Sequence, residues 1–275
     1  MLPRRRDFLE RTLARLAGTM ELAARADTAG AAPGALQALD PRVKGLGFLA
    51  LICAAAASQR IGVTGTLFGV AVLLAAVSGR AVWRSLFPLW GSLFLLTGAA
   101  VLPAIFLTPG PEVFHLPWIG WAVTQPGLHS AAALIARSET TATLATLLVL
   151  TTPWAALLKA LRVLRVPALF ILILGMTYRF VFVLLEIARA FFEARRVRQV
   201  GRLSDQQRRQ MAISSAAILL SKSVQLNGEI YEAMLARGAS GDVRTLDTFC
   251  MHRRDWAALV LFGALAAAAF AMGMR

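Results

Sequence analysis

The sequence predicts an all-α protein that crosses a membrane several times, with about five transmembrane helices and long cytoplasmic helices. Of its 275 residues, 57% are hydrophobic and 16% are charged, whereas roughly 25% of residues are charged in soluble domains. The mean hydropathy is +0.64. The formal net charge is +14, and the basic residues fall between apolar runs, as in loops that face the cytoplasm. This pattern indicates a lipid bilayer as the partner and argues against nucleic acid.

Residues 1–38 precede the first apolar run and are expected to form an extension and a linker. Within them, residues 7–25 place apolar side chains among arginines at helical spacing, which suits an amphipathic helix in the cytoplasm or on the membrane surface. No apolar segment of about 7 to 15 residues follows the basic start, so we expect no cleaved signal peptide.

Residues 39–152 are expected to contain four transmembrane helices, at 46–58, 62–78, 86–107 and 128–152. The first run is short for a span of ~20 residues, so it must include flanking residues. Gln59 and Arg60 follow it directly, and so short a separation from the second run predicts a tight helical hairpin. The connection 108–125 is rich in proline and tryptophan and lacks lysine and arginine, which is typical of an outside loop.

The distribution of basic residues predicts the orientation in a bacterial inner membrane. With the N-terminus in the cytoplasm, Arg80, Arg84 and the basic stretch after the fourth span all lie inside, as the positive-inside rule requires. The run 166–185 is apolar enough to cross, but a crossing there would place the arginines of 189–209 outside. We therefore interpret 153–247 as cytoplasmic helices below and partly against the spans. The last segment, 248–275, contains a final span at 256–274.

Two helical runs end in an Ala-Arg sequence that a glycine follows. The first is Ala194-Arg195-Arg196-Val197-Arg198 with Gly201, and the second is Ala236-Arg237-Gly238. Glycine suits the left-handed residue just beyond a helix C-terminus, so these arginines should lie in last turns. A guanidinium there can pair with carboxylates or carbonyls in a partner's groove. Taken alone, each motif favours the simpler interpretation of an arginine that complements the helix dipole in solvent.

Several motifs occur together in one order along the chain. They are Leu39-Asp40-Pro41-Arg42-Val43-Lys44, Thr151-Thr152-Pro153-Trp154 with 158–167 after it, Met176-Thr177-Tyr178-Arg179-Phe180, and the two arginine motifs. Their combination resembles the transmembrane T component of energy-coupling factor (ECF) transporters, from residue 39 to the C-terminus. The N-terminal extension and the form of the first arginine motif are most similar to the cobalt-transport branch of that family, CbiQ.

The resemblance implies a non-catalytic scaffold that joins two ABC-type ATPase subunits to a membrane S component, CbiM-like if the substrate is cobalt. ATP and Mg²⁺ would be bound by the ATPases, and this chain would hold no cofactor. The ATPase-docking residues that the resemblance implies are Ala194, Arg195, Arg196, Arg198, Ala236, Arg237 and Gly238. Arg196 and Arg198 are alternatives to Arg195, because the first motif departs from the family's Ala-Arg-Gly or Ala-Arg-Ser. Structural or coupling roles are implied for Pro41, Arg42, Pro153, Tyr178, Arg179 and Gly201.

Ionisable residues elsewhere give few further candidates. Arg137 and Glu139 fall inside the fourth span, where such residues are functional candidates. They could equally satisfy neighbouring carbonyls, or the span could start later. The three histidines, His115, His129 and His252, share no metal-ligand spacing, so the sequence predicts no metal site in this chain.

Two other classes of function require features that the sequence lacks. A membrane-embedded enzyme needs clustered nucleophilic or ionisable groups on its spans, and a self-contained transporter needs polar or broken helices in corresponding halves. There is also no phosphate-binding loop of the G-x-x-x-x-G-K-[ST] kind, so ATP coupling must come from a partner. Cobalt, nickel and a vitamin all remain open as the substrate.

Overall fold

The computed structural model describes residues 18, 36–107, 111–115, 122–164, 166–198, 204–238 and 251–273. The residues from 36 onward fall into two compact units. The membrane unit comprises the described residues up to Ala160 together with 251–273, and the α7–α8 unit comprises those between Leu161 and Gly238.

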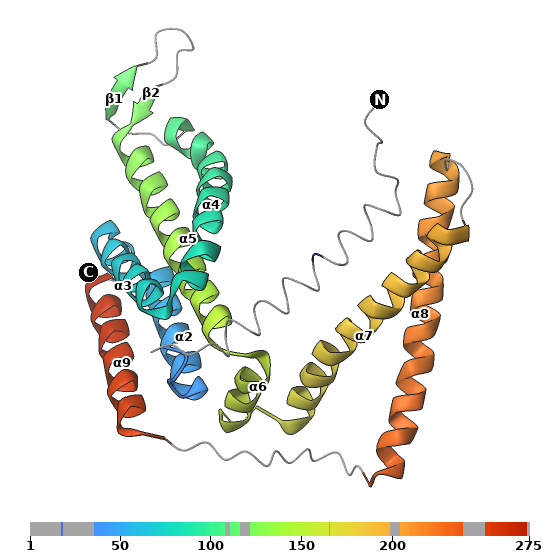
Figure 1. Cartoon of the computed structure of the whole chain (residues 1–275). Coiled ribbons are helices and arrows are strands. Elements are labelled where there is room, and N and C mark those ends of the chain that lie inside the picture. Colours follow the sequence, from blue (N-terminus) through green and yellow to red (C-terminus); the bar gives the residue numbers. More distant parts are fainter. Residues whose placement is uncertain are drawn as a thin grey trace. The chain divides into compact units, whose positions relative to one another are not determined.

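The prediction of an all-α membrane fold is confirmed. The membrane unit contains α2 (Pro41–Ala57), α3 (Ile61–Ser78), α4 (Arg80–Leu107), α5 (Gln125–Thr151), most of α6 (Trp154–Val163) and α9 (Arg253–Gly273). Its α4 and α5 are joined through two short antiparallel strands, β1 (Glu112–His115) and β2 (Ala122–Thr124), within the segment 108–125 that we expected to be an outside loop. The other unit contains α7 (Ala168–Arg198) and α8 (Asp205–Ala236) (Figure 1).

The core of the membrane unit lies where α2, α3, α5 and α9 meet. Helix α2 packs against α9 and α5, and α5 packs against α3 and α4. Buried side chains include Phe48, Leu51, Leu144 and Phe262. Alanines such as Ala55, Ala71 and Ala75 are also fully buried, because small residues let membrane helices approach closely.

Outside that core, α4 presents large apolar side chains to its surroundings. Phe87, Leu95 and Leu96 are 73%, 74% and 71% exposed, as expected for a helix that faces lipid. Pro88 and Pro103 lie inside α4 without ending it, which membrane helices tolerate when neighbouring groups satisfy the freed carbonyls.

Local signals explain where several helices begin and end. Asp40 is the N-cap of α2, its carboxylate accepts a hydrogen bond from Arg42 N, and Pro41 occupies the first turn, where its missing N–H is not needed. Ser58, Gln59 and Arg60 separate α2 from α3, which confirms the predicted tight hairpin. Gln59 N of this turn donates to Gly273 O at the end of α9.

Within the described residues, five helices are long and apolar enough to cross a membrane: α3, α4 over Val82–Pro103, α5, α7 over Ala168–Arg195, and α9. The number of candidate spans agrees with the predicted number of transmembrane helices. Two of the helices, however, differ from those that we predicted to cross. Helix α2, expected as the first span, has 17 residues and is not among the five. Helix α7, which we expected to lie in the cytoplasm, is long and apolar enough to cross because it continues through Tyr178 and Arg179 without a break.

Candidate functional site

The second arginine motif caps the C-terminal end of α8. Ala236 is the last helical residue and Arg237 is the C-cap, while Gly238 adopts φ +75°. Gly238 N donates to Leu235 O at 2.9 Å, and Arg237 N donates to Met234 O at 3.1 Å. All three motif residues are exposed. The geometry expected from the sequence, an arginine at a helix end closed by a left-handed glycine, is therefore present.

The first arginine motif lies in the last turn of α7. Arg195 is half-buried and its Cζ lies 4.7 Å from the centroid of the Phe191 ring, a cation–π contact that orients the guanidinium. Ala194 and Arg198 are exposed. Gly201 and the side chain of Arg196 lie outside the described residues, so the predicted choice among Arg195, Arg196 and Arg198 stays open.

Helices α7 and α8 run in opposite directions (Figure 1), so the two motifs lie at opposite ends of the helix pair. Helix α8 has 32 residues and, at about 1.5 Å per residue, is roughly 48 Å long. The two arginine motifs are therefore separated by a distance close to the length of α8.

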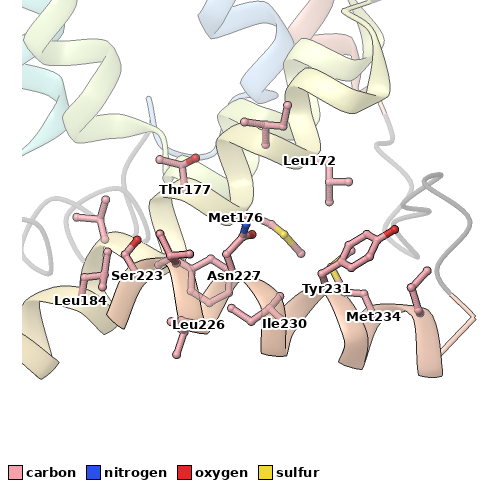
Figure 2. A pocket seen from close by; sticks show the side chains of 15 residues that line it. Leu172, Met176, Thr177, Leu184, Ser223, Leu226, Asn227, Ile230, Tyr231 and Met234 are labelled. Atoms are coloured by element: carbon pink, nitrogen blue, oxygen red, sulfur yellow. The ribbon is translucent and has the colours of Figure 1, made fainter. Parts of the chain in front are cut away.

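An apolar cavity of about 660 Å³ lies between the N-terminal half of α7 and the C-terminal half of α8. Figure 2 shows its lining, in which Thr177, Ser223, Asn227 and Tyr231 carry the polar side-chain atoms among aliphatic, methionine and phenylalanine side chains. The lining extends to Met234 and Leu235, within the last turn of α8 before Arg237. Movement of the α8 end would therefore alter this cavity.

Tyr178 and Arg179 lie beside this cavity without lining it. The Tyr178 ring packs edge-on against Phe182, with centroids 5.0 Å apart, and Arg179 is exposed. Tyr178 thus contributes to packing along its own helix.

A buried cluster of polar groups joins three helix ends in the membrane unit, and sequence reasoning missed it. Lys44 is 1% exposed, and its Nζ donates to Thr151 O at 2.8 Å and to Gln37 O at 3.4 Å. Asp255 Oδ1 accepts a hydrogen bond of 2.9 Å from Asp40 N. Asp40 and Lys44 belong to one of the motifs, but nothing near Asp255 in the sequence indicates that it would join them.

Of the other predicted residues, Pro153 lies at a helix connection and Arg137 contacts one from within α5. Pro153 O accepts hydrogen bonds from Ala156 N and Leu157 N and so starts α6. Arg137 Nη2 donates to Ser58 O in the α2–α3 turn, which supports the interpretation that it satisfies a neighbouring carbonyl. Glu139 is 9% exposed on the same helix. Helix α5 starts at Gln125, so Arg137 and Glu139 both lie within the helix.

In the part of the chain that the structure describes, no group of three or more His, Cys, Asp or Glu residues could hold a metal ion. His129 and His252 are both exposed. The side chain of His115 lies outside the described residues.

Fold and site together define a multi-pass helical membrane protein. The family model described as "Cobalt transport protein" matches residues 35–246, which is more than half of the chain. The chain therefore belongs to the CbiQ family of cobalt transport proteins, the T-component branch that its motifs resemble. It is a transport component and not a catalyst.

Two relatives are similar to this chain. The cobalt transport protein CbiQ of Rhodobacter capsulatus is 37% identical over 158 residues, which cover 56% of this chain and 59% of that protein. An uncharacterized protein of Methanocaldococcus jannaschii is 27% identical over 216 residues, which cover 77% of this chain and 73% of that protein.

Proposed function

We propose that this chain is the T component of an ECF-type importer in a bacterial inner membrane, with cobalt as the substrate. It couples two ABC-type ATPase subunits, which bind ATP and Mg²⁺, to a CbiM-like S component. The observation that carries the proposal is the exposed Arg237 on the capped end of α8. Among the described residues, no ion pair or side-chain hydrogen bond engages its guanidinium.

Such a guanidinium is available to a partner without first breaking an internal contact. In a desolvated groove it would make charge-assisted hydrogen bonds with carboxylates or carbonyls. Truncating one member of such a pair costs about 2 to 5 kcal/mol, because the partner's groups are left unpaired. The same reasoning applies to Arg195, which Phe191 holds in position.

The S component would pack on the apolar surface of α7 and α8. Leu169, Phe170 and Ile173 of α7 and Leu220 and Val224 of α8 are all at least half exposed. Single exposed apolar residues are ordinary, but an apolar surface that extends over two helices is typical of an interface with protein or membrane.

Nickel or a vitamin is the alternative substrate class, and the S component would decide which substrate is imported.

The orientation follows from the charges near α7. Arg189, Arg195 and Arg198 lie at its C-terminal end and Arg209 near the start of α8. If α7 crossed the membrane, these arginines would lie outside, against the positive-inside rule. In the proposed topology the N-terminus and these arginines are cytoplasmic, α7 does not cross the bilayer, and the S component covers its apolar side chains.

The test is co-purification of the ATPases with chains that carry Arg237→Ala, Arg195→Ala or both changes, after co-expression of all subunits. We expect each variant to insert into the membrane normally and ATPase binding to weaken by about 30-fold or more, the equivalent of about 2 kcal/mol. Arg209→Ala, which removes an exposed arginine at the other end of α8, is the matched control.

Separate Arg196→Ala and Arg198→Ala variants decide between the alternatives to Arg195. Unchanged ATPase binding and unchanged cobalt uptake in the double variant would refute the proposal.

A further inference from the structure

The buried cluster of Asp40, Lys44 and Asp255 lies where three helix ends meet inside the membrane unit. We propose that these three residues are positioning residues for energy coupling. They anchor the two chain connections that join α7 and α8 to the transmembrane helices. The inference rests on the proposed function, because coupling presupposes ATPases that act on the α7–α8 unit.

Lys44 holds the C-terminal end of α5. Thr151 is the last residue of that helix, and its carbonyl is one of the terminal groups that have no partner within the helix. The Lys44 ammonium donates to it at 2.8 Å, across 107 residues of sequence. A cation is also favoured at this end by the helix dipole, so the contact fixes the end of α5 to the first turn of α2.

Asp255 holds the N-terminal end of α9 against the start of α2. The carboxylate is 4% exposed, and both of its oxygens accept backbone hydrogen bonds. Oδ1 accepts from Asp40 N at 2.9 Å and Oδ2 accepts from His252 N at 2.8 Å. Asp40 is the N-cap of α2, so one carboxylate joins two helix starts that are 215 residues apart in sequence.

The cluster lies at the two places where the chain enters and leaves the α7–α8 unit. After Thr151 the chain continues through α6 to α7, and α9 follows α8 along the sequence. The boundary of the membrane unit falls at Ala160 on the first connection and at Phe249 on the second. Any force that reaches the spans through the backbone of α6–α7 or α8–α9 therefore arrives at a helix end that this cluster holds.

Because both helix ends are bound to α2, they cannot move apart without breaking a buried hydrogen bond. A buried donor or acceptor left unpaired is strongly unfavourable, so the two ends should move as one body together with α2. Without the cluster, motion of α7 and α8 would be absorbed at the connections.

The test uses the complete importer, reconstituted in liposomes with its ATPases and S component, and measures cobalt uptake and ATP hydrolysis together. Lys44→Met removes the donor to Thr151 O while keeping an unbranched side chain, and Asp255→Asn keeps the shape but replaces one acceptor with a donor. We expect subunit composition and ATP hydrolysis to stay near those of the wild type, and cobalt transported per ATP to fall roughly five- to thirtyfold. Arg84→Met, which removes an exposed cation on α4, should leave that ratio unchanged.

A double variant distinguishes one anchor from two independent contacts. If the residues act together, Lys44→Met combined with Asp255→Asn should lower the cobalt-to-ATP ratio no further than the stronger single change. If Lys44→Met does not assemble, Asp255→Asn alone decides. A wild-type ratio in assembled Asp255→Asn importer, or loss of ATPase binding in that variant, would overturn the inference. Failure of the proposed function would look different, because the unmodified chain would then retain no ATPase.

Discussion

The ring of Phe262 on α9 lies against Gly47 on α2 so closely that no side chain can fit between them. A Cβ at Gly47 would lie 2.4 Å from Phe262 Cδ2 and 2.8 Å from Phe262 Cγ. The same ring packs against Phe48, with centroids 5.7 Å apart. The distance between α2 and α9 is therefore set by the absence of a side chain at Gly47.

Replacing Gly47 with alanine should lower the thermal stability of the protein in detergent. Overpacking of a tight contact costs about 1 to 3 kcal/mol, because Phe262 or one of the helices must shift. Gly45→Ala is the matched control, since no atom lies within 4 Å of a Cβ at that position of the same helix. There, alanine should be neutral or stabilising by roughly 0.5 to 1 kcal/mol. Equal unfolding temperatures for the two variants would contradict the packing argument.

Gly238→Ala should loosen the end of α8 and weaken ATPase binding. The φ of Gly238 is +75°, where an L-residue costs roughly 1 to 2 kcal/mol. We expect faster hydrogen exchange at the amides of Arg237 and Gly238, which bond to Met234 O and Leu235 O. Gly238→Asn should be milder, because asparagine adopts this conformation more readily. Identical exchange in both variants would show that the left-handed residue is not required.

The buried Lys44 should make stability depend on pH in alkaline conditions. It lies in the first turn of α2, before the apolar run, and its pKa is lowered from 10.5 to about 8 by burial, although Asp40 and Asp255 act to raise it. Between those two values the unfolded chain binds more protons than the folded chain, so the free energy of unfolding should rise with pH. Below about pH 8 the contribution of Lys44 should be constant.

The measurement is the unfolding temperature in detergent from pH 7 to pH 10, for the unmodified chain and for Lys44→Met. The difference between the two should change in favour of the unmodified chain as the pH rises through this window. A difference that is independent of pH would show that Lys44 titrates alike in the folded and unfolded chains.

The position of α7 relative to the membrane can be tested with cysteine labelling. After Cys53 and Cys250 are replaced with serine, Glu193→Cys should react with an impermeant reagent only from the cytoplasmic side. Glu193 is an exposed residue near the end of α7, where it pairs with Arg189. Arg60→Cys, in the exposed turn between α2 and α3, should react from the opposite side. Labelling of position 193 from the periplasm alone would show that α7 crosses.

Much of the fold could be predicted from local sequence signals. Continuous apolar runs predicted the helices of the membrane unit, and the short Gln59–Arg60 separation predicted the α2–α3 hairpin. The glycine after Ala236-Arg237 predicted the end of α8, because a left-handed residue beyond a helix depends on its immediate neighbours alone. Whether α7 crosses the membrane does not follow from its length and composition alone, because the arginines at its end would then lie outside.

By itself the sequence determined the class of the protein, most helix ends and the family, because hydropathy, charge bias and capping residues act over one or two turns of chain. Only the tertiary structure decided which helix ends are bound together. It placed Lys44 at the carbonyl of Thr151, Asp255 at the amide of Asp40, and Phe262 against Gly47. These partners are far apart along the chain, and their meeting depends on how whole helices pack, which no local pattern specifies.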